Sequence, residues 1–377
     1  MSNTQCQISN ETLNCIALSM MFPQRGRQLL ELYRRVGSAT TVVENADHLQ
    51  DIVPDLNPDV FMIDSGQLHV CLEKAKAEVD FAQKHTIQIL TVNSEDYPMR
   101  LREVCPDAPL VLYYRGNANL NCSHIISIVG TRTSTQYGLD MVNSICRELA
   151  NYFPELLIVS GLAYGTDINA HRAALEYGMP TVAVLAHGLD HIYPSVHRNT
   201  AQRMMEHGGL ITEFPSSTKM EPTYFLRRNR IIAGLAEATL VVESKERGGA
   251  LSTARMANDY NLTVMACPGR ATDPASMGCN NLIASNSAAL VTSAADIVKA
   301  LNWAVPKRKC PTLPSLFEGN LSAEEKIVYD KLGSEPQHFS LIVTATGLSV
   351  PIVLSVLNEL EFRGIIRQLP GSKWRKI

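Results

Sequence analysis

The sequence lacks an excess of positive charge, because 34 lysines and arginines are set against 37 aspartates and glutamates, for a formal net charge of −3. This balance argues against a protein that coats nucleic acid through bulk charge, and any such binding must come from a local basic patch. The nine cysteines are scattered, with no Cys-x-x-Cys pair and no Cys/His cluster at zinc spacing. This usage is typical of reduced, mostly buried cysteines in a cytosolic protein.

Long apolar segments are also missing. No uninterrupted apolar run approaches the roughly 18 residues that a membrane span needs. The polar start, MSNTQCQISNE, has neither the basic nor the apolar region of a signal peptide. We therefore expect a soluble, cytoplasmic protein without a membrane partner.

The usual signatures of several enzyme classes are absent as well. There is no Gly-x-x-x-x-Gly-Lys-Ser/Thr phosphate loop and no Gly-x-Gly-x-x-Gly after the first buried strand of the central region. ATP hydrolysis and dinucleotide redox chemistry thus lack their motifs. No nucleophile, base and orienting acid are placed together either. We expect a protein that is not an enzyme and that carries no cofactor.

What the chain does contain is a long alternation of strand and helix patterns. Its 377 residues, 45% hydrophobic and 19% charged, suggest two or three ordinary globular domains. The alternation predicts an α/β fold with a mainly parallel sheet covered on both faces. Strands are expected at 86–92, 110–114, 125–129, 157–160, 181–185, 210–212, 239–243, 263–266 and 289–291.

The flanking segments predict two further modules. Residues 1–84 indicate short helices joined by Gly, Pro and Ser turns, for which we favour packing or protein contact over a DNA-binding helix-hairpin-helix. A linker at 305–319 separates the sheet domain, 85–304, from residues 320–377, whose helix, helix-turn-helix and two short strands are typical of a winged helix. Winged helices bind DNA or protein. Few basic residues precede Arg363 on the polar face, which favours protein contact.

The stretch 125–138, IISIVGTRTSTQYG, carries the clearest functional signal. Its apolar run predicts a buried strand, Gly130 permits a tight turn, and the residues that follow can cap a helix beginning near Tyr137. A helix N-terminus beside a glycine turn directs unpaired N–H groups and a positive dipole end at one place. Together with the charge of Arg132, this pattern predicts a phosphate site.

Two other loops follow strands of the same sheet, where open α/β sheets bind their ligands. In residues 160–167, SGLAYGTD, Ser160 and Tyr164 can donate to an anion or stack on a base. We interpret Asp167 as a helix cap and the following His171 as a satisfied buried histidine. A metal site is an alternative for the next loop, although no further convergent ligands are identified. Its candidate ligands are His187, Asp190 and His191.

The stretch 224–235, YFLRRNRIIAGL, combines aromatic rings with guanidinium groups on a predicted helix, and Lys219 lies just upstream. Single-stranded nucleic acid is bound by rings that stack on bases and by charges that contact phosphates. At least one of these arginines is expected to pair inside the domain instead. We expect this above all of Arg230, with Asp167, Asp190 or Glu243 as its partner.

In their order along the chain, these motifs resemble the bacterial DNA-processing protein A family, DprA or Smf. The resemblance runs from about residue 89 to 301, and both flanking modules also fit the architecture of the family. It rests on IVGTR at 128–132 with YG at 137–138, SGLAYGTD at 160–167 with AH at 170–171, GLD at 188–190 with YP at 193–194, EFP at 213–215, RNRIIAGL at 228–235 and PG at 268–269.

The resemblance implies an extended Rossmann-like domain that binds and protects single-stranded DNA, loads the recombinase RecA onto it in natural transformation and recombination, and forms a homodimer. The family's phosphate turn would be Gly130-Thr131-Arg132, with threonine where serine is common. Lys219 would match the basic residue ahead of the arginine-rich helix. The DNA-binding residues implied are Gly130, Thr131, Arg132, Ser160, Gly161, Tyr164, Gly165, Lys219, Tyr224, Phe225, Arg227, Arg228 and Arg230.

Two other functions stay open. A nucleotide-processing enzyme of the phosphoribohydrolase type shares glycine-rich Rossmann loops, but Gly248-Gly249-Ala250-Leu251 lacks the Gly-Thr and following glutamate that those enzymes use. The third possibility is a structural scaffold in which the Arg132 turn binds nothing. Salt-dependent DNA affinity would support single-stranded DNA binding, and release of base from a nucleotide would support the enzyme. If neither is observed, the structural scaffold is favoured.

Overall fold

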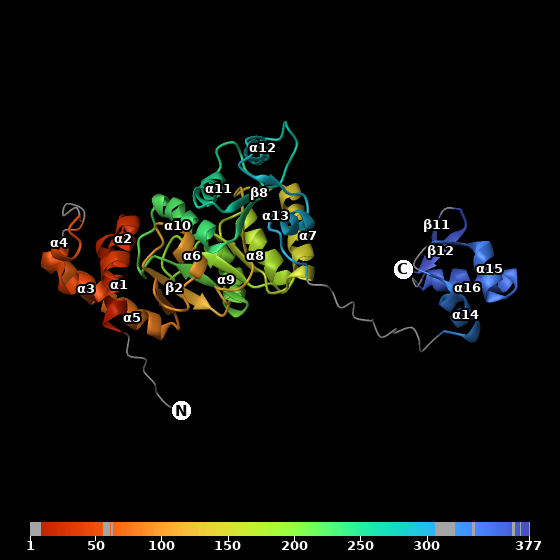
Figure 1. Ribbon diagram of the computed structural model, residues 1–377, viewed down its shortest axis with the longest axis horizontal. Coiled ribbons are helices and arrows are strands. Elements are labelled where there is room, and N and C mark those ends of the chain that lie inside the picture. Colours follow the sequence, from red (N-terminus) through yellow and green to blue (C-terminus); the bar gives the residue numbers. More distant parts are fainter. Residues whose placement is uncertain are drawn as a thin grey trace, which may run out of the picture. The chain divides into compact units, whose positions relative to one another are not determined.

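The computed structural model describes residues 9–55, 61, 63–305, 321–333, 336–363, 366–369 and 371–376. The chain divides into two compact units, Met1–Val305 and Pro306–Ile377. The first unit contains a helical module and a nine-stranded sheet domain, and the described part of the second contains three helices with a small sheet (Figure 1).

The large sheet has the strand order β1-β2-β6-β5-β4-β3-β7-β8-β9. From β6 to β9 in that order all neighbours are parallel, whereas β2 is antiparallel to both β1 and β6. The predicted α/β class with a mainly parallel sheet is therefore confirmed. The strands are β1 Gln88–Thr91, β2 Val111–Gly116, β3 Ile125–Val129, β4 Leu157–Ser160, β5 Thr181–Val184, β6 Gly208–Thr212, β7 Ala238–Val241, β8 Thr263–Ala266 and β9 Ala289–Leu290.

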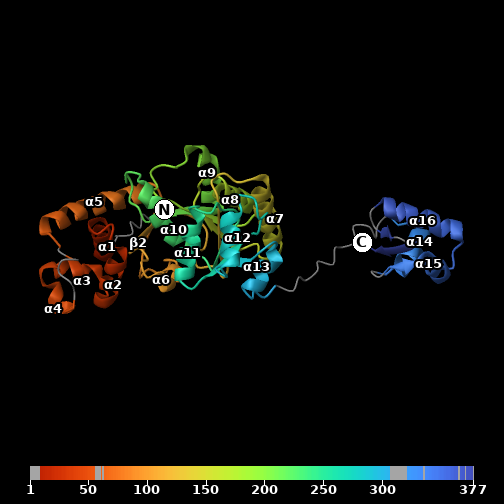
Figure 2. The same cartoon turned by 90° about the horizontal axis from the view of Figure 1, so that it is seen from above.

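Both faces of this sheet are covered by helices, as Figures 1 and 2 show. Ile126 and Ile128 of β3 pack with α7, α8 and α13, while Ile125 and Val129 of the same strand pack in a second cluster with α10 and α11. Successive side chains of a strand point to opposite faces, so a strand buried on both sides is a continuous apolar run. The helices are α6 Met99–Val104, α7 Gln136–Tyr152, α8 Thr166–Glu176, α9 Arg198–Glu206, α10 Pro222–Leu235, α11 Ala250–Asp259, α12 Met277–Ala284 and α13 Ala294–Ala300, with a 3₁₀ turn η2 at Ser195–His197.

The direction of winding changes at β3. The chain moves outward from β3 through β4, β5 and β6, and then returns to the other side of β3 for β7, β8 and β9. The loops that follow β3 and β7 therefore lead away from each other and leave a crevice at the carboxyl ends of the two strands. Gly130, after β3, and Ser244, after β7, line one cavity there.

The N-terminal helices pack against the β1–β2 end of the sheet (Figures 1 and 2). Their apolar side chains, such as Ile16 and Leu30, belong to the same buried cluster as Ile125 of β3. The carboxylate of Glu11 accepts the backbone N–H of Ala39 at 2.7 Å, which ties α1 to the start of α3. The elements are α1 Asn10–Met21, α2 Gly26–Val36, α3 Ala39–Glu44, η1 Ala46–His48, α4 Leu49–Ile52 and α5 Ser65–Lys84.

The second unit has its own core, in which Val328, Leu357 and Trp374 are buried together. It consists of α14 Ala323–Lys331, α15 Phe339–Thr346 and α16 Val350–Phe362 with strands β10 Gln337–His338, β11 Ile366–Leu369 and β12 Lys373–Lys376, in the sheet order β10-β12-β11. This is the winged helix that the sequence predicts. Within the described ranges, no helix is by itself long and apolar enough to cross a membrane, and α15 with α16 meets that criterion only as a pair bent by 113°.

Candidate functional site

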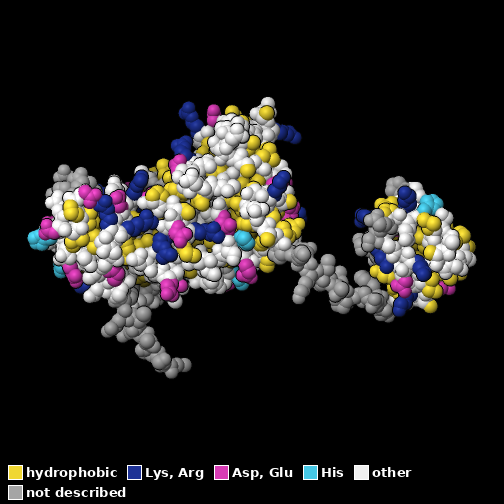
Figure 3. All heavy atoms as spheres, in the orientation of Figure 1, with side chains coloured by type: hydrophobic (Ala, Val, Ile, Leu, Met, Phe, Trp, Pro, Cys, Tyr) yellow, Lys and Arg dark blue, Asp and Glu magenta, His cyan; other side chains and the backbone are white. Residues whose placement is uncertain are grey.

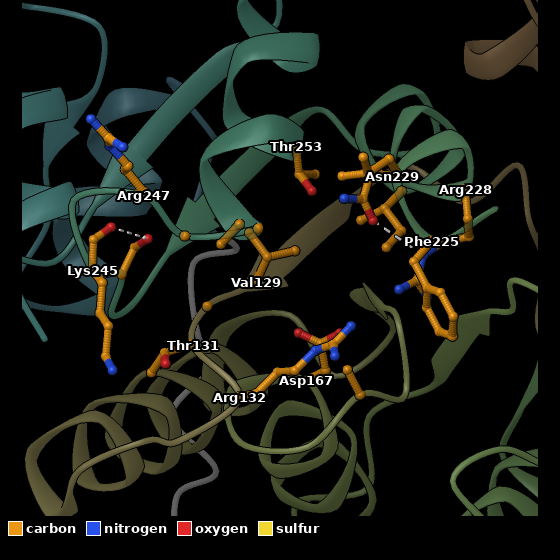
Figure 4. A pocket seen from close by; sticks show the side chains of 18 residues that line it. Val129, Thr131, Arg132, Asp167, Phe225, Arg228, Asn229, Lys245, Arg247 and Thr253 are labelled. Atoms are coloured by element: carbon orange, nitrogen blue, oxygen red, sulfur yellow. Dashed lines mark hydrogen bonds between the residues drawn. The ribbon is translucent and has the colours of Figure 1, made fainter. Parts of the chain in front are cut away.

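A cavity of 240 Å³ occupies the crevice between β3 and β7 (Figure 4). Its wall comes from the turn after β3, the start of α8, one side of α10 and the loop after β7. The charged side chains that line it are Arg132, Asp167, Arg228, Lys245 and Arg247. Four cations around one carboxylate form a local basic patch in a protein whose net charge is −3. Elsewhere on one face of the first unit, basic and acidic side chains alternate (Figure 3).

The turn after β3 is held by the loop after β7. The backbone N–H of Thr131 donates to the carbonyl of Glu243 at 2.8 Å. Thr135, the N-cap of α7, donates its backbone N–H and its hydroxyl to the Glu243 carboxylate at 2.9 and 2.5 Å. An internal carboxylate therefore occupies the positive end of α7, which removes that helix N-terminus from the predicted phosphate site. Thr131 and Arg132 still line the cavity, so their side chains are the groups of the turn that an anion could reach.

Two predicted glycines allow the loops after β3 and β4 to touch. Gly165 has φ +75° and ψ −123°, and a Cβ at that position would meet the backbone carbonyl groups of Thr131 and Arg132. A Cβ on Gly130 would meet the side chain of Thr166. The glycines thus serve close approach of backbone segments, and they fix the position from which Arg132 extends.

Arg132 is exposed, and its guanidinium carbon lies 5.7 Å from the ring centroid of Phe225 at the start of α10. The Phe225 ring is in turn edge-to-face with Tyr193, at 6.0 Å between centroids. Tyr193 is 45% exposed and Tyr164 is 49% exposed. Two rings, Phe225 of α10 and Tyr193 after β5, therefore lie together beside the Arg132 guanidinium, whereas the exposed Tyr164 ring after β4 packs edge-to-face on His197 at 5.0 Å between centroids.

Tyr193 is a site residue that sequence reasoning missed, as are Lys245 and Arg247. The signal for Tyr193 was its place in a loop directly after β5. The signal for the two cations was their place between β7 and the glycine pair that opens α11. In Figure 4 these two cations lie across the cavity from Phe225 and Arg228.

Arg228 is predicted to contact DNA, but its side chain is buried, with 4% of the residue exposed. Its Nη1 donates to the carbonyl of Gly161 at 2.7 Å and to the carbonyl of Val184. Burial lowers the pKa of Arg228 to about 10, against the opposing effect of the nearby Asp167 carboxylate. A Cβ at Gly161 would meet the guanidinium group, so this glycine leaves room for the Arg228 side chain. Arg228 therefore positions the loops after β4 and β5 from the floor of the cavity.

Ser160 and Asp167 are also internal. The hydroxyl of Ser160 is fully buried and donates to the carbonyl of Ile128 at 2.6 Å, which corrects its predicted role as a donor to a ligand. Asp167 is buried in the first turn of α8, whose N-cap position is held by Gly165, so it is not the predicted cap. Burial raises the pKa of Asp167, and the charge of Arg228 offsets part of this effect.

The other side of α10 faces a second cavity, of 520 Å³, between the N-terminal helices and the sheet domain. Arg230 pairs there with Glu213 at 2.6 Å and with Asp107 at 3.5 Å. The expectation that Arg230 pairs inside the domain is confirmed, but the three partners expected for it are wrong. Glu213 and Asp107 come from loops next to β6 and β2, which the fold brings beside α10.

Arg227 and Tyr224 lie on that same side of α10. Arg227 donates to Glu213 at 2.5 Å and to the carbonyl of Pro23, and Tyr224 stacks on Phe214 at 4.6 Å between ring centroids. Residues three apart in a helix share a face, so Tyr224, Arg227 and Arg230 point away from the cavity that Phe225 and Arg228 line. The structure therefore separates these three predicted residues from the Arg132 cavity.

Lys219 is exposed in the loop that joins β6 to α10. This loop is held by Glu78 of α5, whose carboxylate accepts the backbone N–H of Ser216 at 2.9 Å and its hydroxyl at 2.5 Å. Burial raises the pKa of Glu78. The N-terminal module thus fixes the base of the segment that carries Lys219.

The histidine loop offers no metal site among the described residues, where no group of three or more His, Cys, Asp or Glu side chains is arranged to hold an ion. His187 is buried, donates to the carbonyl of Gly188 at 2.8 Å and stacks on His191 at 4.4 Å. His191 lies 3.2 Å from Asp190. His171 is fully buried, as expected, but it is only partly satisfied: Nδ1 lies 2.7 Å from the Thr181 hydroxyl oxygen, whereas Nε2 has no partner among the described residues.

Comparison with known proteins assigns both parts of the chain. A family model described as DNA recombination-mediator protein A matches residues 88–302, and one described as DprA winged helix domain matches residues 314–372. Protein Smf from Synechocystis sp. is 33% identical over 328 residues, which cover 78% of this chain and 81% of that protein.

Two solved structures are similar to the chain. That of DNA processing protein A from Streptococcus pneumoniae has a TM-score of 0.61 and 31% identity, and the match covers 76% of this chain and 97% of that one. A structure that concerns the single-stranded DNA binding mode of DNA processing protein A from Helicobacter pylori has a TM-score of 0.51 and 27% identity, over 57% of this chain and 95% of that one. Because the first family model spans more than half of the sequence, the chain belongs to the DNA recombination-mediator protein A family.

Proposed function

We propose that this protein binds single-stranded DNA across the carboxyl ends of β3, β4, β5 and β7. The observation that carries the proposal is the contact of the Arg132 guanidinium with the Phe225 ring, beside the exposed ring of Tyr193. Single strands are bound by positively charged grooves whose aromatic side chains stack on unpaired bases. The relative from Helicobacter pylori, whose single-stranded DNA binding mode is the subject of its structure, supports the same ligand.

The phosphates of the strand are assigned to Arg132, Lys245 and Arg247, which are exposed and line the cavity. Each phosphate contact releases counterions and so makes affinity depend on salt. Arg228 adds positive potential from below, although its Nε and Nη1 donate to groups inside the domain. None of these groups reads a base edge, so binding is expected to be independent of sequence.

From family membership we extend the proposal to the finer role. The protein protects incoming single-stranded DNA and loads RecA onto it during natural transformation and recombination, as a homodimer in the cytoplasm. It acts without catalysis. The internal engagement of Asp167 and Glu243, the carboxylates next to the cavity, supports binding over the base release of a phosphoribohydrolase-like enzyme.

The test is a titration of single- and double-stranded oligonucleotides at several salt concentrations, with wild type, Arg132→Ala and the control Arg147→Ala, which removes an exposed arginine from α7. We expect wild type to prefer the single strand, Arg132→Ala to bind it at least about tenfold more weakly, and Arg147→Ala to match wild type. Equal affinities for the two variants would remove Arg132 from the site. Release of free base from added nucleotides would favour the enzyme instead.

A further inference from the structure

The small sheet of the winged helix has one buried and one exposed face. Ile366 of β11 and Trp374 of β12 are buried in the core of the unit. Because side chains alternate along a strand, Arg367 of β11 and Lys373 and Arg375 of β12 share the opposite face, and all three are exposed. We call this set of three cations the wing face.

The register of the two strands sets like charges against each other. Arg367 and Arg375 are direct partners across the antiparallel ladder. Like charges directly opposite destabilise such a pair. The described strands β10, β11 and β12 contain no Asp or Glu, and the ion pairs found in the described part of this unit are both made by Arg363, with Glu325 at 3.2 Å and Glu359 at 2.9 Å.

Among the residues that the structure describes in this unit, no carboxylate pairs with Arg367 or Arg375, and the repulsion between them would be offset by an external anion. We propose that the wing face binds the phosphate backbone of DNA, as a second nucleic-acid site on a different unit from the Arg132 cavity. Guanidinium groups match phosphate oxygens with paired N–H donors, and the neighbouring Lys373 adds a point charge. His338 of β10 lies opposite Lys373 in the ladder and extends the same face.

The helix that follows the turn of this winged helix does not fit the same ligand. α16, with the sequence VPIVLSVLNELEF, contains two glutamates and no lysine or arginine. Its exposed side chains include Val350 and Leu354. A negatively charged, partly apolar helix is a poor element for the major groove, so contact is restricted to the strands and to the DNA backbone. The three cations of the wing face follow Arg363 in the chain. The polar face of the helices, considered alone, therefore indicated protein contact.

Glu361, near the end of α16, contacts the backbone of β11. Its carboxylate accepts the backbone N–H of Gln368 at 2.9 Å, at the edge of β11. This bond uses Glu361 to anchor the strand. The wing face therefore keeps its positive charge and has a fixed geometry.

The experiment uses the full chain with Arg367→Gln/Arg375→Gln, made both in wild type and in Arg132→Ala. The matched control is Lys326→Gln/Lys331→Gln, which removes two exposed cations from α14 of the same unit. A third variant, Arg367→Lys/Arg375→Lys, keeps the charge. Affinity for labelled single-stranded and duplex DNA is measured from about 50 to about 200 mM salt.

In the Arg132→Ala background we expect Arg367→Gln/Arg375→Gln, the Gln pair, to bind DNA at least about tenfold more weakly than Arg132→Ala alone. We also expect the steepness of log affinity against log salt to fall by about 1.4 for single strands or by about 1.8 for duplex. Whichever DNA, single-stranded or duplex, loses more affinity is the form that the wing face prefers. The Lys pair and the α14 control should keep most of the affinity. A Gln pair that binds both DNA forms as tightly as the α14 control overturns the proposal.

Folding is checked by thermal melting of the same variants. Removing the opposed arginines should leave the melting temperature of the winged helix unchanged or higher, because a repulsion is relieved. If the Gln pair instead unfolds the winged helix, the DNA affinity of Arg367→Lys/Arg375→Lys tests the proposal. A folded Lys pair that loses as much affinity as the Gln pair overturns the assignment of charge to this face.

Discussion

The guanidinium of Arg132 and the ring of Phe225 meet in a cation–π contact at 5.7 Å, although one belongs to the turn after β3 and the other to the first turn of α10. Such contacts contribute about 0.5–1 kcal/mol at exposed sites. The contact holds side by side the group that we propose binds a phosphate and the group that we propose stacks on a base. Charge and stacking can therefore be tested separately.

Phe225→Leu should weaken binding of single-stranded DNA without changing its dependence on salt. Loss of one base stack costs about 1–3 kcal/mol, which is about five- to 150-fold in affinity. The phosphate contacts remain, so the slope of log affinity against log salt stays at the wild-type value. Fluorescence anisotropy at several salt concentrations measures both quantities. Tyr152→Leu, which removes an exposed ring from the end of α7, is the control and should bind as wild type does; a reduced slope in Phe225→Leu would show that the ring only supports Arg132.

Lys245→Gln/Arg247→Gln should produce the complementary result. Removal of one cation that binds a phosphate of the single strand lowers the salt slope by about 0.7, so the double variant is expected to lower it by about 1.4. Lys299→Gln/Arg147→Gln removes the same charge from exposed positions on α13 and α7 and should leave the slope unchanged. An equal reduction of the slope in both double variants would mean that the salt dependence of binding reflects only the total charge of the protein. The loop after β7 would then not bind the strand specifically.

The central strands of the sheet domain could be predicted because burial on both faces leaves an apolar run with few alternatives, as in β3, β4 and β5. β3 and β4 have the bounds that the sequence indicates, and Gly130 follows β3 as expected. The helical face of α7 is equally clear, since Val142, Ile145 and Leu149 are buried. Buried strands and the buried face of a helix depend on residues that are close in sequence, so the periodicity of apolar residues predicts them.

The internal roles of the charged residues could not be predicted in the same way. The bond between Glu243 and Thr135 exists because β7 lies beside β3, and strand order is not contained in the local pattern. Likewise Arg230 meets Asp107 only because α10 packs near the loop before β2. The division of α10 into two faces was available from its spacing of three, but which face meets the ligand depends on the position of the N-terminal module.

Gly165→Ala should reduce both stability and DNA binding, whereas Gly178→Ala should reduce stability only. Both glycines have a positive φ, +75° and +73°, but a Cβ at Gly165 would meet the carbonyl groups of Thr131 and Arg132 and a Cβ at Gly178 would meet nothing within 4 Å. We expect a loss of about 1–2 kcal/mol in unfolding free energy for Gly178→Ala and a larger loss for Gly165→Ala.

Urea denaturation and oligonucleotide titration of the two glycine variants provide the comparison. Relief of the close approach in Gly165→Ala requires the turn that carries Arg132 to shift, so its affinity should fall while that of Gly178→Ala stays at the wild-type value. Equal stability and equal affinity for the two variants would show that the loops after β3 and β4 move freely and do not fix Arg132.

The imidazole of His171 is fully buried beside Thr181. The hydroxyl of Thr181 donates to the carbonyl of Ile158 at 2.9 Å, so His171 must donate from Nδ1 to the Thr181 oxygen at 2.7 Å. Its bare Nε2 has no partner among the described residues. Burial, together with the positive charge of Arg228, lowers the pKa of His171 to about 3, from an ordinary value of 6.5.

Because the pKa is lower in the folded than in the unfolded state, His171 takes up a proton on unfolding at pH values between the two. Its contribution to stability is complete above pH 6.5 and is lost as the pH falls toward 3. Over that window we expect wild type to lose about 2–4 kcal/mol more unfolding free energy than His171→Asn, which keeps a donor toward Thr181 and cannot titrate. Urea denaturation at a series of pH values measures the difference, and His48→Asn, at a histidine whose side chain is 75% exposed, should keep the wild-type pH dependence. If His171→Asn follows the wild-type curve, the acid sensitivity of the fold arises elsewhere.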